Sequence, residues 1–459
     1  VLLPTSGALA QGHRGPPDPI ETFRIALERS GFVVNDGMAD TMDWAEEYCA
    51  GTLPSGGYVN KAPYVRVRVP KSSDDLGLTE VFQLRPDEAV VLIGETPPPV
   101  NYFGYHAFLW SRVHPDGERE RLFGTLGDTV NNATIKTIGR DPFSQIAVFI
   151  FTPDQATDAG VRAALHRAGY PTAIMNTIVF PAAMLNLGHG ESDDQLRIVM
   201  RVGKWDVPEI GQSYMDNLSE KLAVFRVTPS EEVAANPFPV PPLRVRGTGQ
   251  TEMDLMGTVE QLRQGIIDAH AGLYEAVDIP SRPNWYEGYD YIQRHQDPGG
   301  DSRDAFFLSA GYLPEYGSLD KFTLADGEFL VVYGANHVAT GKATYMSVNA
   351  YASETAKLSI GQVFDNRLSG TALDYLPSGD PNAGLLYAYK IARDCAGHSN
   401  CLELSADDYN TAAHPECVAI GAETVLGVIF RMYLEPPTSV GPVMPEMLYD
   451  RVIKFSPRY

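Results

Sequence analysis

Residues 82–94 read FQLRPDEAVVLIG, and residues 322–334 read FTLADGEFLVVYG. The two segments share five residues at one constant offset, and a sixth identity follows when Tyr105 is matched with Tyr345 at the same offset. The five pairs are Phe82 with Phe322, Leu84 with Leu324, Glu88 with Glu328, Val91 with Val331, and Gly94 with Gly334. Six identities without a gap, spread over a shared strand–turn–strand pattern, predict an internal duplication.

The composition and the apolar patterns around these segments indicate the fold class. The chain has 42 glycines and 34 prolines, which favours many short strands and turns over a helical bundle. Residues 64–69 alternate between apolar and basic side chains, and residues 89–93 and 102–110 are strongly apolar or aromatic, as strands are. We therefore predict an α+β, β-rich fold with two related antiparallel β-sandwich-like repeats and flanking helices.

A length of 459 residues is too great for one hydrophobic core and predicts two or three domains. The clearest boundary is the proline-rich segment NPFPVPPLRVR at 236–246. We expect a flexible start at 1–18, an N-terminal domain with the first repeat at 19–235, a linker at 236–250, and a C-terminal domain with the second repeat at 251–459.

Two helices stand out between the expected strands. Residues 154–170 form a helical pattern inside a β–α–β passage, whose first turn, TPDQATD, has no glycine-rich phosphate loop. A nucleotide is therefore not expected there. After the linker, apolar residues recur every three or four positions from Leu255 to Val277, which predicts a long helix that ends near Pro280.

The net charge of −22 argues against a nucleic acid or an anionic membrane as partner. No apolar run is long enough to cross a bilayer, so membrane insertion is not expected. The first residues, VLLPTSGALAQG, are typical of the end of a signal peptide, with a disordered start as the alternative. We expect an acidic protein that is secreted or periplasmic, and the oligomeric state stays open.

The four cysteines agree with export, because an even number in an exported chain indicates disulfides. Cys395 and Cys401 flank a short turn-rich loop that a bridge closes easily, which leaves Cys49 to pair with Cys417. The alternative is a metal site made of Cys395, Cys401 and His398, whose spacing matches no common zinc motif. No cofactor is expected, and the metal content is not predicted.

Five polar or aromatic side chains beside the matching strands are the candidate catalytic residues. His337, Lys342 and Tyr345 follow the strand of the second repeat, and Tyr105 and His106 occupy the partner position in the first. A histidine, a lysine and a tyrosine at the rim of a sheet could act as base, electrostatic clamp and proton donor of a hydrolase or lyase. The competing interpretation is that His337 and Lys342 are solvated loop residues and that the tyrosines belong to the core.

The candidate substrate-binding residues are Trp285, Tyr286, Tyr289 and Asn336. The three aromatic residues lie among acids and amides, a combination that stacks on sugar rings and bonds their hydroxyl groups when it is exposed. When buried, the same aromatic residues are core packing at the end of the long helix.

The segment YDYIQRHQDPGGDSRDAFFLSAGY and the repeat that follows it resemble uncharacterised secreted bacterial proteins with paired β-sandwich domains. The matching elements are Tyr291, Arg294, the 326–327 turn, the strand at 330–333 and the aromatic strand at 345–351, about a fifth of the chain. The sequence departs from these proteins at one place: they have an aromatic Trp-Ser step where this chain has Tyr345, followed by Met346 and Ser347. The resemblance implies the fold and export, and it implies no reaction.

Two functional hypotheses follow. In the first, the protein is an exported hydrolase or lyase that acts on a carbohydrate or another small neutral substrate at the junction of the two repeats. In the second, it is a non-catalytic exported protein that binds a ligand or takes part in surface assembly. A deep cleft lined by the five candidate catalytic residues would favour the enzyme.

Overall fold

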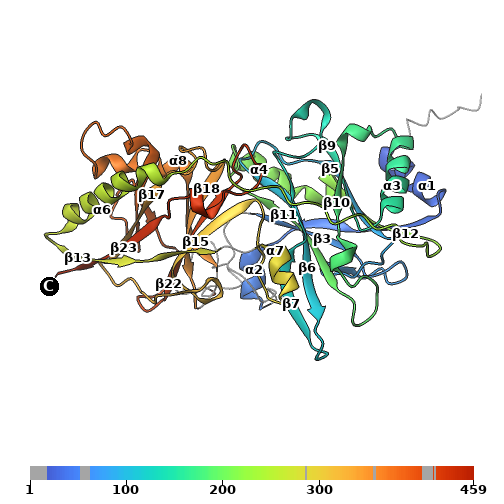
Figure 1. Ribbon diagram of the computed structural model, residues 1–459, viewed down its shortest axis with the longest axis horizontal. Coiled ribbons are helices and arrows are strands. Elements are labelled where there is room, and N and C mark those ends of the chain that lie inside the picture. The colour runs from blue at the N-terminus through green and yellow to red at the C-terminus, as the bar shows by residue number, and fades with distance from the viewer. Residues whose placement is uncertain are drawn as a thin grey trace, which may run out of the picture.

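The computed structural model describes residues 18–51, 63–284, 287–354, 358–405, 417 and 420–458. The chain forms two halves that lie side by side along the long axis of the molecule (Figure 1). Each half contains two β-sheets and a helical layer. In each half we call the sheet that faces the other half the inner sheet and the remaining one the outer sheet.

The N-terminal half pairs its strands in two sheets. The outer sheet has the order β1-β12-β5-β9-β10, and the inner sheet has the order β2-β3-β11-β6-β7, with β4 beside β3 and β8 beside β6. The strands are β1 (Phe32–Asp36), β2 (Met38–Thr41), β3 (Tyr64–Pro70), β4 (Leu78–Thr79), β5 (Ala89–Glu95), β6 (Phe103–Val113), β7 (Arg119–Thr125), β8 (Val130–Asn131), β9 (Ile146–Thr152), β10 (Met175–Val179), β11 (Gln195–Val202) and β12 (Leu222–Pro229).

The C-terminal half repeats this topology. Its outer sheet has the order β13-β23-β17-β20-β21, and its inner sheet has the order β14-β15-β22-β18-β19, with β16 beside β15. The strands are β13 (Tyr274–Ile279), β14 (Ser281–Asn284), β15 (Ala305–Leu313), β16 (Ser318–Leu319), β17 (Phe329–Ala335), β18 (Tyr345–Ala352), β19 (Ser359–Phe364), β20 (Leu386–Ala392), β21 (Cys401–Glu403), β22 (Leu426–Tyr433) and β23 (Arg451–Pro457).

The two strand orders match position by position, so the predicted β-rich fold with two related repeats is confirmed. Strands β5 and β17, which carry the repeated sequence, are the central strands of the two outer sheets. All pairs are antiparallel except β9 with β10 and β20 with β21, which are parallel and equivalent. A shared irregularity of this kind at the same place in both halves is what a duplicated module would retain.

Helices cover the outer face of each outer sheet. In the N-terminal half these are α1 (Pro19–Glu28) and α3 (Gln155–Arg167), whose apolar residues pack on β1, β5, β9, β10 and β12. In the C-terminal half α6 (Met256–His270) packs on the equivalent sheet. Separate cores fill the space between the two sheets of each half. The layers therefore run helix, sheet, sheet, sheet, sheet, helix (Figure 1).

Equivalent short helices of the two halves are exchanged across the junction. Helix α2 (Trp44–Cys49), between β2 and β3, places Tyr48 against the core of the C-terminal half. Helix α7 (Gly288–Gln293), between β14 and β15, places Ile292 in the core of the N-terminal half. The remaining helices are α4 (Pro208–Asp216), α5 (Leu218–Lys221) and α8 (Asp365–Leu368). Each half thus completes the packing of the other.

The repeated glutamate has the same role in both halves. Glu88 accepts the backbone N–H of Arg85 at 2.8 Å, and Glu328 accepts that of Ala325 at 2.8 Å. Each also binds a cation and a hydroxyl on the neighbouring strand: Arg226 and Thr228 on β12, Lys454 and Ser456 on β23. Burial alone would raise the pKa of Glu88, but the His189 hydrogen bond and the Arg226 charge hold it well below its usual range. This glutamate ties the turn to the sheet in each copy.

The match of Tyr105 with Tyr345 is wrong by three residues. Gly104 pairs with Arg201, and Ser347 pairs with Arg431, at equivalent places on β11 and β22. The structural partner of Tyr345 is therefore Tyr102, and Tyr105 corresponds to Val348. The reason is a loop: the connection between β5 and β6 is shorter than the one between β17 and β18, so a constant offset fails beyond it.

The expected long helix also ends early. Helix α6 stops at His270, and residues 274–279 form edge strand β13, which pairs with β23. Leu273 and Val277, which the helical stripe would bury, are 72% and 52% exposed. The backbone N–H and C=O groups of this segment form hydrogen bonds with β23. This pairing with a distant strand outweighs the helical periodicity of the sequence.

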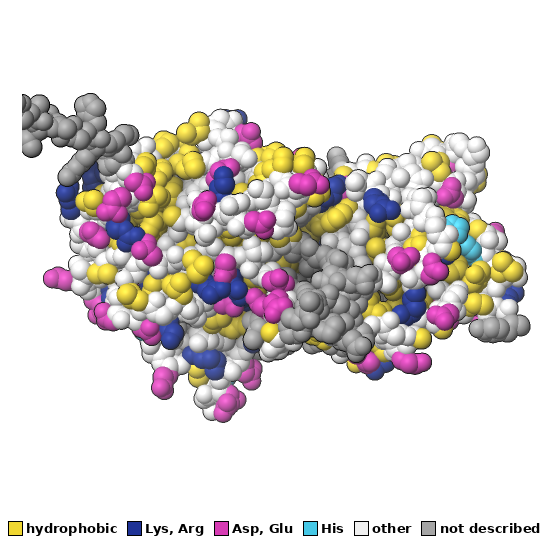
Figure 2. Space-filling view, turned by 180° about the vertical axis from the view of Figure 1, so that it is seen from behind, with side chains coloured by type: hydrophobic (Ala, Val, Ile, Leu, Met, Phe, Trp, Pro, Cys, Tyr) yellow, Lys and Arg dark blue, Asp and Glu magenta, His cyan; other side chains and the backbone are white. Residues whose placement is uncertain are grey.

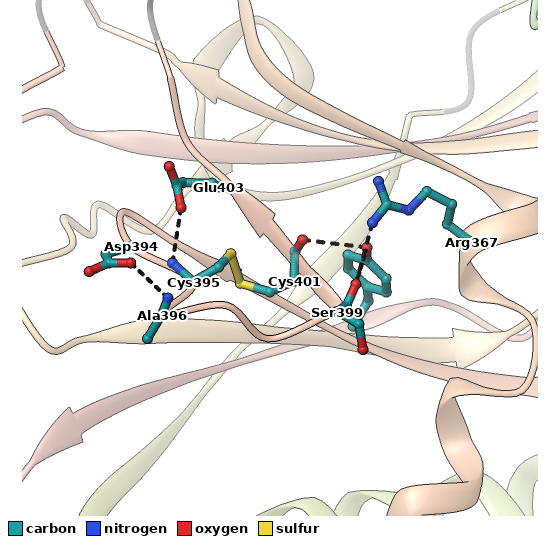
Figure 3. Close-up of a disulfide and its surroundings, with 8 residues drawn as sticks. Arg367, Asp394, Cys395, Ala396, Ser399, Cys401 and Glu403 are labelled. Carbon is teal, nitrogen blue, oxygen red and sulfur yellow. Dashed lines mark hydrogen bonds between the residues drawn. A yellow bond between two sulfur atoms is a disulfide. The ribbon is translucent and has the colours of Figure 1, made fainter.

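Both predicted disulfides are confirmed. Cys49–Cys417 joins α2 of the N-terminal half to the C-terminal half across 368 residues. Cys395–Cys401 closes the loop between β20 and β21 (Figure 3). The equivalent connection in the N-terminal half contains the 13-residue helix α3, whereas here residues 393–400 suffice. Because both thiols are bonded, the alternative metal site at this loop is wrong. The described residues contain no cluster of three or more histidine, cysteine or acidic side chains suited to a metal ion.

The acidic side chains are distributed over the surface. Figure 2 shows Asp and Glu side chains scattered across both halves of one face, with Lys and Arg among them. No helix in the described part of the chain is long and apolar enough to cross a membrane.

The two equivalent glutamates provide a matched test of the repeat. Glu88→Gln leaves the fully buried Arg226 without its carboxylate, so we expect the free energy of unfolding to fall by about 3–5 kcal/mol. Glu328→Gln affects a partly exposed pair with Lys454 and should cost about 1 kcal/mol. Urea denaturation of both variants measures the difference, and equal losses would contradict it.

Candidate functional site

The five residues predicted to be catalytic are buried, and the structure does not gather them in one site. His337 lies between two carboxylates, with Nδ1 2.8 Å from Glu252 and Nε2 3.0 Å from Asp450. Burial lowers its pKa, but the two carboxylates outweigh burial and raise the pKa of His337 to about 10. His337 is therefore the cation of a closed ion cluster.

Lys342 belongs to a second cluster. Its Nζ lies 2.6 Å from Glu435 and also binds Glu446. Although burial lowers the pKa of Lys342, its hydrogen bonds to these two carboxylates raise it. Like His337, Lys342 joins loops of the C-terminal half through ion pairs.

The other three lie in aromatic packing. Tyr105 is in the core of the N-terminal half, where the centroid of its ring lies 3.8 Å from that of the Phe149 ring. His106 and Tyr345 are at the junction of the halves: His106 Nε2 is 3.0 Å from the Tyr102 hydroxyl, and Tyr345 packs on Tyr433. Burial lowers the pKa of His106 well below its ordinary value, so its ring is neutral.

The residues predicted to bind substrate are placed as follows. Trp285 and Tyr286 lie outside the described residues. Tyr289 is at the junction, where its hydroxyl donates to the Leu126 carbonyl at 3.1 Å and burial raises its pKa to about 12. Asn336 is buried and its side chain accepts the Ala339 N–H at 3.2 Å, as the cap of a turn. Neither side chain lines a cleft at the junction.

The junction itself has a pseudo-two-fold arrangement. Tyr102 packs on Tyr433, with ring centroids 4.5 Å apart. In the equivalent contact, Tyr345 takes the place of Tyr102 and Gly203 takes the place of Tyr433. A Cβ atom built on Gly203 would lie 3.4 Å from the ring of Tyr345. Near the axis, Asn101 Nδ2 lies 3.5 Å from the carbonyl oxygen of its own equivalent, Thr344. Such paired contacts are those of a symmetric dimer, here within one chain.

An open cleft of about 690 Å³ lies at this junction. Its walls come from the loop after β11 and from the start of α8, so each half supplies one side. The lining residues are Pro63, Asn101, Gly203, Lys204, Trp205, Asp206, Pro208, Phe364, Asn366 and Arg367. The volume is within the range of small-ligand sites.

Trp205 is the main aromatic surface of the cleft, and the fold holds it in place. Its backbone bridges to Val100, and its half-buried ring lies directly on the backbone of Gly211 in α4. A Cβ added at Gly211 would come within 2.2 Å of the Trp205 ring. Glycine at 211 therefore allows the indole to lie flat on the helix, and Phe364 faces the same cleft from the other half.

The polar groups of the cleft balance in charge. Lys204 of the N-terminal half and Asp365 of the C-terminal half form an ion pair at 3.3 Å. Asp206, Asn366 and Arg367 are exposed at the rim. The charged groups in and beside the cleft are two cations and two carboxylates, so their charges sum to zero, and the side chains of two asparagines add hydrogen-bonding groups. These residues are Lys204, Arg367, Asp206, Asp365, Asn101 and Asn366.

The equivalent place on the other side of the pseudo-axis is filled. There, Arg244 from the segment between the halves donates to the carbonyl oxygens of Thr129 at 2.9 Å and Ser439 at 2.8 Å. Arg303 adds an ion pair with Asp128 at 3.0 Å. The connection between the halves can occupy only one of the two equivalent places. The other is the open cleft.

None of the residues predicted from the sequence to be catalytic or substrate-binding lines this cleft. Its signal in the sequence is Lys204-Trp205-Asp206, a tryptophan between charged residues directly after the apolar strand at 196–202. A lone tryptophan in a loop does not indicate which part of the other half it will face.

No family model and no curated protein matches the chain. Two solved structures are similar to it over most of its length. One is an uncharacterised protein from Burkholderia cenocepacia, with 12% identity, 95% of this chain and 90% of that chain covered, and a TM-score of 0.39. The other is the VPA0106 protein from Vibrio parahaemolyticus, with 10% identity, coverage of 95% and 99%, and a TM-score of 0.37. The weak resemblance to uncharacterised bacterial proteins is confirmed, and it carries no information on activity.

The buried histidine predicts a pH dependence of stability. Because the folded-state pKa of His337 is raised, its stabilisation is fully present below about pH 6.5 and is lost as the pH rises through about 10. The free energy of unfolding of wild type minus that of His337→Gln should therefore be largest near neutral or lower pH and shrink at alkaline pH. Urea denaturation across this range measures it.

The exposed His398 is the matched control, and His398→Gln should give a difference close to zero at every pH. A difference for His337→Gln that does not change with pH would show that the ring is neutral in the folded protein.

Proposed function

We propose that this protein is an exported ligand-binding protein that holds a carbohydrate, or a similar neutral polyhydroxylated molecule, in the cleft between Trp205 and Phe364. The observation that carries the proposal is an indole that lies on the Gly211 backbone and lines the cleft together with an aromatic ring of the other half, with amide and charged groups among the other lining residues. Sugar rings stack on aromatic faces through their C–H groups, and their hydroxyls bond such polar groups.

The charge balance of the rim supports a neutral ligand. Lys204 and Asp365 neutralise each other, and Asp206 and Arg367 provide one further charge of each sign. A charged ligand would gain no net Coulomb energy from this set.

Burial of the candidate catalytic residues favours binding over the hydrolase or lyase hypothesis. His337, Tyr105 and His106 have no exposed surface, and Lys342 and Tyr345 are at most 3% exposed. A catalytic group must come within hydrogen-bond reach of the proton it transfers. The enzymatic hypothesis stays a prediction, and the cleft supports the binding alternative better.

The two disulfides support the exported part of the proposal. Cys49–Cys417 and Cys395–Cys401 are bonds that persist in oxidising compartments such as the periplasm or the extracellular space. We therefore expect the ligand to be one that such a protein meets outside the cytoplasm.

The test is a screen of neutral oligosaccharides by thermal shift, followed by calorimetric titration of the ligands found. Trp205→Ala removes the stacking surface and should weaken binding by about 10-fold or more, if a sugar ring gains on the indole what a nucleobase gains on an aromatic side chain, about 1–3 kcal/mol. Gly211→Ala, which displaces the indole without removing it, should weaken binding as well.

Tyr312→Ala is the matched control, because Tyr312 is a half-buried aromatic residue outside the cleft. It should bind like wild type. The proposal would be contradicted if no neutral saccharide raised the melting temperature, or if Trp205→Ala bound a detected saccharide as tightly as the control.

A further inference from the structure

A second pocket, of about 740 Å³, lies in the C-terminal half. Its walls are the N-terminal part of α6, the turn between β13 and β14, and residues 444–452 at the start of β23. These elements belong to the C-terminal half, in which α6, β13 and β23 extend to the left end of the molecule in Figure 1. The pocket shares no lining residue with the junction cleft.

Methionine is the most frequent residue type in the walls of this pocket. Four of the 12 methionines of the chain line it: Met253 and Met256 from one side, Met444 and Met447 from the other. A backbone hydrogen bond joins the segments that carry these two pairs of methionines: the Glu252 N–H donates to the Glu446 carbonyl at 2.9 Å. Ile279 and Tyr449 complete the apolar surface. Methionine is unbranched and polarisable, so it adapts to irregular apolar ligands and makes favourable contacts with aromatic rings.

The charged groups in the walls are already paired within the protein. Arg263 binds Asp278 at 3.0 Å, and Arg451 binds Glu260. Asp450, at the base, receives hydrogen bonds from His337 at 3.0 Å and Tyr387 at 2.7 Å. A charged ligand would have to lose its hydration or displace one of these partners. The pocket therefore fits an uncharged molecule.

The base of the pocket is fixed, while its rim is exposed. Glu252, His337 and Asp450 form a buried cluster, and Glu252 also accepts the Leu448 N–H at 2.9 Å. At the opening, Met256 is 46% exposed on the surface of α6. Covering such a side chain with an apolar ligand gains roughly 25 cal/mol per Å² of apolar surface removed from water. A rigid base with an adaptable apolar rim is a preformed site.

We propose that this pocket binds a neutral, mainly apolar small molecule that contains an aromatic ring. This goes beyond the proposed function, because it assigns a second site with the opposite ligand chemistry. The two proposals are independent, and either can fail without the other.

The test is a fluorescence titration of the full-length protein with Nile red, a neutral dye whose emission shifts to the blue in apolar surroundings. One saturable site is expected. Met256→Lys places a charge at the rim and should weaken dye binding by about 10-fold or more. Leu319→Lys is the control, since Leu319 is 63% exposed and does not line the pocket, and it should bind like wild type.

Ligand charge is tested by displacement of the dye with 2-naphthol and with 2-naphthoate, which share one ring system. The neutral 2-naphthol should displace Nile red at a concentration about 10-fold or more below that of the anion. The proposal would be overturned by the absence of saturable binding, by equal binding to Met256→Lys and Leu319→Lys, or by equal displacement by both naphthalenes. A folded Met444→Trp variant, which fills the pocket with a larger side chain, should also lose dye binding.

Discussion

The structure depends on the face-to-face packing of the two inner sheets. This contact buries Arg201 and Arg431, equivalent residues on β11 and β22, among aromatic rings. Arg201 lies over Phe108 at 5.5 Å, and Arg431 lies over Phe307 at 5.1 Å. A buried guanidinium is tolerated only where hydrogen bonds and rings replace its water. Separating the halves would expose this apolar surface and break the hydrogen bond that Arg201 donates to the Gly300 carbonyl of the other half at 2.8 Å.

The packing is completed by the exchange of α2 and α7 and by the Cys49–Cys417 bridge. Each half contains an apolar side chain that belongs to the core of the other, so the halves fold as parts of one unit. The junction cleft consequently has walls whose relative position is set by a covalent bond and by two cores. Preorganisation of this kind reduces the entropy that a ligand must lose on binding.

The duplication also explains why only one cleft is open. A pseudo-two-fold junction creates two equivalent places, but one chain has only one connection between its halves. Arg244 of that connection, with Arg303, occupies one place through bonds to Asp128, Thr129 and Ser439. The other place keeps its space, and there Trp205 has a flat glycine surface to lie on. The difference between the two places thus follows from the connectivity of the chain.

Much of the fold could be predicted from local sequence, and little of the site could. The strands follow from local periodicity, and the repeat follows from two similar segments of the sequence. The short loop between Cys395 and Cys401 indicates one disulfide, which leaves Cys49 to pair with Cys417. The equivalence of Tyr345 could not be read correctly, because a length difference in one loop changes the register without leaving a local signal. His337 and Lys342 carry polar side chains in a loop, and their burial depends on Glu252 and Glu435, which are 85 and 93 residues away in the sequence. Trp205 lines a cleft only because residues of the other half lie opposite it.

Calorimetry tests the packing of the halves most directly. If the inner sheets, the exchanged helices and the Cys49–Cys417 bridge bind the halves into one cooperative unit, differential scanning calorimetry will show a single unfolding transition. Its calorimetric and van't Hoff enthalpies should have a ratio of about one. Two resolved transitions, one for each half, would contradict the account, because they would show that the halves unfold without exposing a shared core.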